Sequence, residues 1–244
     1  MTLPVIHRVT TLDLAFQPWP WPFAEERRAD IDAHFAVKRR EKPIWNGRIL
    51  LGRSPDFTAG RFSASYFEAD FASFLAWRDW DFPDATVFNG FGMGALRCSD
   101  GAFILGEMGQ HTSNAGRIYF PSGTPDLDDI RGAAVDISGS VAREVEEETG
   151  LCPADYRAAA HWDCVVSGSA IAMIRILDVD TPGEALRVRI EANLARQRQP
   201  ELCAVHLVRG RDDLTAAMPR FVTAFVEAQT SAWIFEDKKG DRLP

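Results

Sequence analysis

The sequence lacks any apolar run long enough to cross a membrane and has few cysteines. No stretch approaches the roughly 20 uncharged apolar residues of a membrane helix. Its start has no basic segment followed by a continuous apolar one, so we expect no signal peptide. The four cysteines are widely spaced without a CxxC pair, which argues against a cysteine zinc site. Cys98, Cys164 and Cys203 stand among apolar residues, so we expect buried thiols in a reducing, cytoplasmic compartment.

Positive charge is also scarce. The 27 basic and 35 acidic side chains give a formal net charge of -8, so we expect neither nucleic acid nor an anionic membrane as a partner. A phosphate-bearing ligand would need a divalent cation to reverse the local sign. The content of 46% apolar and 25% charged residues is ordinary for a globular protein and excludes disorder as the main state.

The first 86 residues differ from the rest because they hold five of the seven tryptophans. Most of these should be core or interface residues, and stacking on a base or sugar is the alternative. The pattern predicts a helix at 24–42, strands at 47–54 and 61–71, and a short helix at 70–80. Because residues 81–92 are rich in turn formers, we expect 1–86 to form an N-terminal α+β extension or small subdomain, followed by a main domain at 87–235 and a tail at 236–244.

The main domain mixes strands and helices without regular alternation, which predicts a mixed α/β sheet rather than a doubly wound parallel one. Two apolar runs flank Ser99-Asp100-Gly101 and predict a hairpin. Expected strands are 93–98, 102–107, 116–123, 158–166, 170–179 and 202–209, and expected helices are 138–149, 183–197 and 219–230. The glycine-rich segment 89–94 lacks the context of a dinucleotide-binding or P-loop motif, so we interpret it as a turn.

Three carboxylates of the helix predicted at 138–149 carry the chemical signal. Glu144, Glu147 and Glu148 stand at i, i+3 and i+4 and share an arc of roughly 100°. Three like charges on one face are costly unless a cation neutralises them, and hard oxygen ligands suit Mg²⁺ or Mn²⁺. Arg143 lies one turn before Glu147 and can orient its carboxylate. The alternative is an ordinary solvated acidic face.

The flanks of this segment fit a helix that packs against a sheet. Asp136 or Ser138 can cap its start, and Gly150 suits the left-handed position after its end. Val141 and Val145 supply an apolar edge.

Residues 143–151, REVEEETGL, match the second half of the Nudix box, and the chain resembles a Nudix hydrolase over roughly residues 93–235. The resemblance implies a Nudix-type α/β/α sandwich with a mixed sheet. It also implies that Glu144, Glu147 and Glu148 bind divalent metal and that Arg143 orients them. The preceding FPSG is similar to the strand-to-turn entry of the box.

Two departures from the family pattern stand out. The family has a glutamate eight residues before the arginine, where this chain has Val135. The spacing from Gly123 to the helix is also longer and is filled by an acidic loop. Asp136 or the loop aspartates Asp126, Asp128 and Asp129 could take over the missing contact to the arginine, and a solvated turn is the alternative for the loop.

The other candidates are single residues. Glu201, at the start of a late strand, matches the late metal-binding or basic glutamate of Nudix enzymes, or is a surface carboxylate. His111, His161 and His206 lack metal-ligand spacing, and we expect His206 to be packed or paired. Ser167-Gly168-Ser169 lacks the flanks of a nucleophile elbow.

The resemblance implies Mg²⁺- or Mn²⁺-dependent hydrolysis of a diphosphate in a nucleoside diphosphate linked to another group, with a nucleotide-sugar-like small molecule as the preferred substrate. Glu148 or Glu201 would accept the proton of the attacking water. A coenzyme A diphosphatase, a non-catalytic Nudix-fold ligand sensor, and an interaction protein whose acidic helix docks a basic partner stay open. A homodimer is compatible with the sequence.

Overall fold

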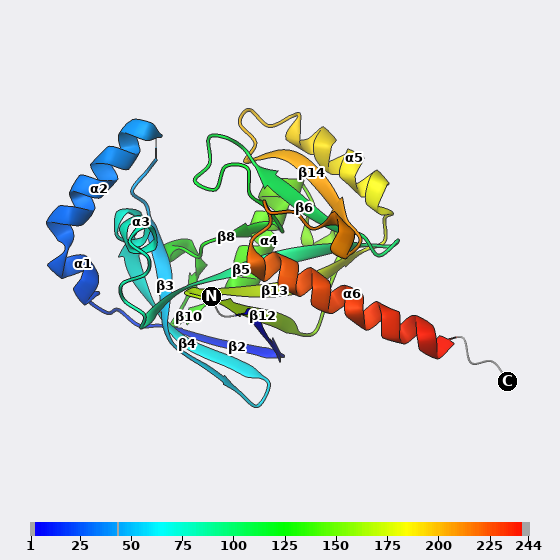
Figure 1. Ribbon diagram of the computed structural model, residues 1–244, viewed down its shortest axis with the longest axis horizontal. Coiled ribbons are helices and arrows are strands. Elements are labelled where there is room, and N and C mark those ends of the chain that lie inside the picture. The colour runs from blue at the N-terminus through cyan, green and yellow to red at the C-terminus, as the bar shows by residue number, and fades with distance from the viewer. Residues whose placement is uncertain (1–2, 43, 241–244) are drawn as a thin grey trace.

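A computed structural model describes residues 3–42 and 44–240, with side chains through residue 230 (Figure 1). The N-terminal part contains β1 Val5–Val9, β2 Thr11–Phe16, α1 Pro22–Glu26, α2 Arg28–Glu41, β3 Arg48–Thr58, β4 Arg61–Asp70 and α3 Phe71–Asp79. It is followed by β5 Val87–Cys98, β6 Phe103–Met108, β7 Ile118–Tyr119, β8 Ser122–Gly123, the 3₁₀ turn η1 Leu127–Asp129, β9 Ile130–Arg131, β10 Ala134–Val135 and α4 Ile137–Thr149. The last elements are the 3₁₀ turn η2 Pro153–Asp155, β11 Arg157–Ala158, β12 Trp162–Ser167, β13 Ala170–Val179, α5 Gly183–Leu194, β14 Leu202–Val208, the 3₁₀ turn η3 Arg211–Asp213 and α6 Arg220–Gly240.

The strands form a mixed sheet in the order β1-β12-β13-β5-β3-β4-β2-β10-β9, which confirms the predicted mixed α/β class. β5 is its central element, running parallel to β13 from Asn89 opposite Ala170 to Cys98 opposite Val179. β5 is also antiparallel to β3 and β8. Strands from the two ends of the chain therefore share one sheet, since β1 pairs with β12 and β3 pairs with β5.

Helices cover both faces of the sheet (Figure 1). The apolar edge predicted for α4 is confirmed, because Val141 and Val145 are buried against β5. On the opposite face, Phe221 of α6 meets Phe91 of β5 edge-on, with ring centroids 5.4 Å apart. No helix within 3–42 and 44–240 is both long and apolar enough to span a bilayer.

The glycine-rich segment 89–94 is part of β5, so its interpretation as a turn is wrong. Successive side chains of a strand point to opposite faces, and here Gly92 and Gly94 face α4, whereas Gly90 faces Tyr66 and Phe88. A Cβ at Gly92 would lie 2.5 Å from Cγ2 of Val141, and one at Gly94 would lie 2.5 Å from Cγ2 of Val145. These glycines let the helix approach the strand closely.

The N-terminal helices pack on their own apolar cluster. The helix predicted at 24–42 is divided into α1 and α2, and it packs near α3. The cluster includes Trp21 and Trp77, both buried, whereas Trp45 is 84% exposed. Most elements of this part therefore follow the predicted pattern, with core tryptophans as expected.

One cysteine and the C-terminal end also differ from expectation. Cys98 and Cys164 are buried as predicted, but Cys203 is exposed, because it lies at an irregular pairing position of the outer strand β14. α6 continues to Gly240, so residues 236–240 of the predicted tail are helical, and 241–244 lie outside the described residues.

Candidate functional site

The carboxylate helix α4 begins and ends as its sequence requires. The Asp136 side chain accepts a hydrogen bond of 2.9 Å from the backbone N–H of Gly139, which caps the first turn. Gly150 ends the helix with a φ of 76°, a left-handed conformation that glycine adopts without steric cost. Predicted as 138–149, the helix spans Ile137–Thr149.

Of the four glutamates of α4, Glu144 and Glu148 contact β8, and the three predicted ligands differ in burial. Glu147 is exposed and the Glu144 side chain is 17% exposed. Glu148 is 5% exposed, and its Oε1 has no hydrogen-bond partner although it is buried. The backbone N–H of Ser122 donates to the Glu148 carboxylate. Gly123 leaves room for its neighbour, because a Cβ there would lie 2.3 Å from Glu144 Oε1.

Crowding of these carboxylates changes how they bind protons. Burial and the charge of Glu147 raise the pKa of Glu144 to about 7. Burial, followed by the charges of Glu144 and Glu201, raises the pKa of Glu148 well above its usual value, although the hydrogen bond from Ser122 opposes the rise. The site thus holds more negative charge than its own side chains neutralise.

Glu201 comes to the same place from the other end of the domain. It lies immediately before β14, and its carbonyl oxygen accepts a hydrogen bond of 2.7 Å from the backbone N–H of Gly109. Its charge contributes to the raised pKa values of Glu144, Glu148 and Tyr119. The charge of Glu201 thus acts on Glu144 and Glu148, although its side chain is exposed.

Arg143 is held by a loop aspartate. Its guanidinium donates to both oxygens of Asp129, at 2.6 and 3.2 Å, and lies 3.5 Å from Glu144 Oε1. Within the part of the chain that is described, its carboxylate neighbours are thus Asp129 and Glu144, so the expected pairing with Glu147 is wrong. The guanidinium does not bond to Glu147 along the helix, because η1 presents Asp129 to it from the side.

Asp129 is 1% exposed, so the solvated-turn alternative for this loop residue is wrong. Its Oδ2 also accepts a hydrogen bond of 3.0 Å from the backbone N–H of Asp126, which closes a capping box around η1. Val135, at the position of the family glutamate, is buried in the apolar core and pairs with Ile130. Asp136 caps α4 instead of contacting Arg143.

Two features of Glu144 and Glu148 favour a divalent cation as their partner. The buried Oε1 of Glu148 has no hydrogen-bond partner, and the pKa of Glu144 is raised. A nearby positive charge would stabilise both carboxylates. Among the described residues, no three His, Cys, Asp or Glu side chains are placed so that together they could hold a metal ion. A cation would therefore share its ligands with water or substrate, as Mg²⁺ commonly does.

Two of the remaining candidates, His206 and His161, have partners of their own. His206 pairs with Glu107 at 3.0 Å, as expected for a paired histidine in a strand. His161 lies 3.9 Å from Asp163, a buried carboxylate that Arg8 and Gln229 also contact. These contacts fasten β1, β12 and α6 together and have a structural role.

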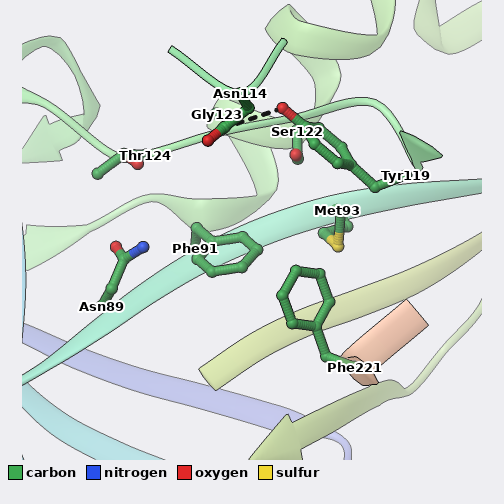
Figure 2. A pocket seen from close by; sticks show the side chains of 9 residues that line it. All are labelled: Asn89, Phe91, Met93, Asn114, Tyr119, Ser122, Gly123, Thr124 and Phe221. Carbon is green, nitrogen blue, oxygen red and sulfur yellow. Dashed lines mark hydrogen bonds between the residues drawn. The ribbon is translucent and has the colours of Figure 1, made fainter. Parts of the chain in front are cut away.

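A small cavity of about 100 Å³ lies at β8 (Figure 2), the strand whose Ser122 donates a hydrogen bond to Glu148. Ser122 and Gly123 of β8 line it together with Asn89, Phe91 and Met93, the side chains of β5 that face away from α4. Tyr119 closes one wall and accepts a hydrogen bond of 3.1 Å from Asn114 Nδ2. The sequence reasoning missed these residues, and the alternation of glycine with Asn, Phe and Met at 89–94 was the signal that could have revealed them.

Comparison with known proteins gives similarity at the level of structure. No family profile matches the sequence, and no curated protein is similar to it. A solved Nudix hydrolase from M. smegmatis, RenU, has 13% identity and a TM-score of 0.35 over 64% of this chain and 87% of its own. The MutT protein from Methanosarcina mazei Go1 has 18% identity and a TM-score of 0.37 over 62% and 96%. A Nudix hydrolase from Nitrosomonas europaea has 14% identity and a TM-score of 0.34 over 64% and 93%.

Proposed function

We propose that this chain is a Nudix hydrolase that splits a diphosphate bond, in the presence of Mg²⁺ or Mn²⁺, in a nucleoside diphosphate linked to another group such as a sugar. The observation that carries the proposal is the buried, unpartnered oxygen of Glu148, at a position where burial and the charges of Glu144, Glu201 and Glu147 raise the pKa of this carboxylate. An acidic surface helix would leave its carboxylate oxygens in water, whereas this helix turns one of them into the protein.

The negative charge of these carboxylates favours a substrate that binds together with a divalent cation. A diphosphate would be repelled by these carboxylates, so substrate and protein would hold a divalent ion between them. When bound, the ion supplies Lewis-acid polarisation of a phosphorus–oxygen bond and lowers the pKa of a coordinated water.

The chain's own residues would then orient a carboxylate and accept the proton of the attacking water. Arg143, fixed by Asp129, holds Glu144 in place at the edge of the site. Glu148 or Glu201 takes the proton of the attacking water, which breaks one phosphorus–oxygen bond and releases two phosphate monoesters or a monoester and phosphate. Positioning and electrostatics account for most of the rate in phosphoryl transfer.

The test is a hydrolysis panel of UDP-sugars, ADP-ribose, NADH, dinucleoside polyphosphates and coenzyme A, each with and without Mg²⁺. We expect turnover of at least one compound that requires the metal and falls by at least about 100-fold in Glu148→Gln, the range expected when a catalytic carboxylate is removed. Glu146→Gln is the matched control, since Glu146 is exposed on the same helix and faces Tyr156 rather than the site.

Three outcomes would contradict the proposal. Equal activity of Glu146→Gln and Glu148→Gln would place catalysis elsewhere. Absence of turnover together with tight, metal-independent ligand binding would favour the sensor. Binding to a basic protein partner alone would favour the interaction protein.

A further inference from the structure

The small cavity beside the carboxylates opens into a larger one of about 410 Å³. The two share six lining residues: Asn89, Phe91, Asn114, Tyr119, Thr124 and Phe221. The larger volume lies within the range of about 300–1,000 Å³ that is typical of small-molecule sites. One elongated ligand can therefore reach from the carboxylates into the larger cavity.

The N-terminal part of the chain builds the far wall of this larger cavity. Phe71, Phe74 and Arg78 of α3 line it, and Phe82 follows in the next turn. Lys42, at the end of α2, donates a hydrogen bond to the carbonyl oxygen of Thr112, in the loop that lines the cavity from the main domain. The extension thus completes a site that the main domain begins.

The aromatic side chains of the lining favour a flat ring. Five phenylalanines and Tyr119 contribute faces or edges, and no Asp or Glu is among the described residues that line the cavity. Polar side chains, among them Asn89, Asn114 and Arg117, also line the cavity, so a base can stack on the aromatic rings while its polar edge meets hydrogen-bonding groups.

One polar group in the lining has an unmet hydrogen-bonding requirement. Asn89 Oδ1 is buried and has no hydrogen-bond partner among the described residues. An amide side chain offers one acceptor and one donor group, which match the paired donor and acceptor on the edge of a nucleobase. Asn89 lines both cavities, so it stands where the two regions join.

We infer that the larger cavity binds the base of the substrate, with the ring among the phenylalanines of α3, β5 and α6 and its edge on Asn89. The diphosphate then lies at β8, where Ser122 and Gly123 contact the carboxylate helix. This inference rests on the proposed function for its substrate class, and it assigns the N-terminal extension a role in recognising the base.

The experiment measures binding without turnover. The full chain in EDTA is titrated by calorimetry with UMP, CMP, AMP and GMP, and with ribose 5-phosphate, which lacks the base. We expect at least one nucleoside monophosphate to bind on the order of tenfold or more tightly than ribose 5-phosphate, because a stacked base contributes that much affinity. Phe71→Ala and Asn89→Leu should each weaken that binding on the order of tenfold while ribose 5-phosphate binding stays unchanged.

Phe57→Ala is the matched control, since Phe57 is a half-buried phenylalanine of β3 that stacks on Phe62 away from the cavity. Thermal unfolding of each variant separates loss of the site from loss of the fold. Equal affinity for ribose 5-phosphate and every monophosphate, or wild-type affinity in both cavity variants, overturns the inference. Hydrolysis with an unchanged KM in both variants overturns it while leaving the proposed function intact. Binding of the base without any metal-dependent hydrolysis supports it and contradicts the proposed function.

Discussion

Replacing Asp129 by asparagine should loosen the arginine that borders the carboxylates. Asp129 is 1% exposed and binds Arg143 through both oxygens. Breaking a buried ion pair by removing one partner costs about 3–5 kcal/mol. The Arg143 side chain is 33% exposed and can still reach water, and asparagine keeps an acceptor for the backbone N–H of Asp126. We therefore expect a loss of about 2 kcal/mol, which in a chain of this size lowers Tm by about 4–8 °C.

Asp129→Asn should reduce the apparent affinity for Mg²⁺ more than it reduces the stability of the fold. Arg143 lies 3.5 Å from Glu144, so its release frees that carboxylate to move. Partners that orient metal ligands are typically worth about 10–100-fold in metal affinity or activity. The assay is a Mg²⁺ titration of hydrolysis, in which the half-saturating concentration should rise by that factor. Asp128→Asn, the same change at an exposed neighbour, should leave both Tm and the Mg²⁺ titration unchanged.

A double-mutant cycle decides whether the two residues act as a unit. If Asp129 works through Arg143, the Mg²⁺ defects of Asp129→Asn and Arg143→Gln should not add in the double variant. Fully additive defects, or a normal Mg²⁺ titration in Asp129→Asn with only Tm lowered, would refute the positioning role and leave Asp129 a purely structural residue.

Three further measurements follow from the structure. Gly92→Ala should lower the free energy of unfolding in urea by about 1–3 kcal/mol, because its Cβ would overlap Val141; an unchanged midpoint would contradict the close packing of α4. Burial opposes ionisation of Asp70, but hydrogen bonds from Arg28 and Ser73 outweigh it and hold its pKa below the usual value. Its stabilising effect is therefore present above about pH 4 and lost as the pH falls through the folded pKa, so Asp70→Asn should show a shallower acid loss of Tm. Mg²⁺ at about 100 times its Kd should stabilise the wild-type chain by about 2.7 kcal/mol in thermal unfolding and should have much less effect on Glu148→Gln.

The carboxylate helix could be predicted from the sequence because its signals are local. Spacing at i, i+3 and i+4 places three glutamates on one face, Asp136 and Gly150 mark the ends, and the apolar edge follows from the helical period. Each of these depends on residues within one or two turns. The helix bounds therefore differ from the prediction by a single residue at the start.

The partner of Arg143 could not be predicted in the same way. In the sequence, Asp126, Asp128 and Asp129 are equally plausible partners of Arg143. In the fold, the η1 turn and the hairpin β9–β10 bury Asp129, and Val135 lies in the core. Burial of a charge is decided by tertiary packing, and a local composition rule predicts a solvated turn for all three.

The interpretation of residues 89–94 as a turn hid the side chains of β5 that line the cavity. The glycines of β5 resemble a turn when counted by composition, yet they alternate with larger side chains at the period of a strand. Gly92 faces α4 and pairs with Gly123, which in turn leaves the space that Glu144 occupies. Phe91, on the opposite side, faces the cavity and Phe221. A side chain at either glycine would move the carboxylates relative to the cavity, so the small residues at these positions set the distance between the two parts of the proposed active site.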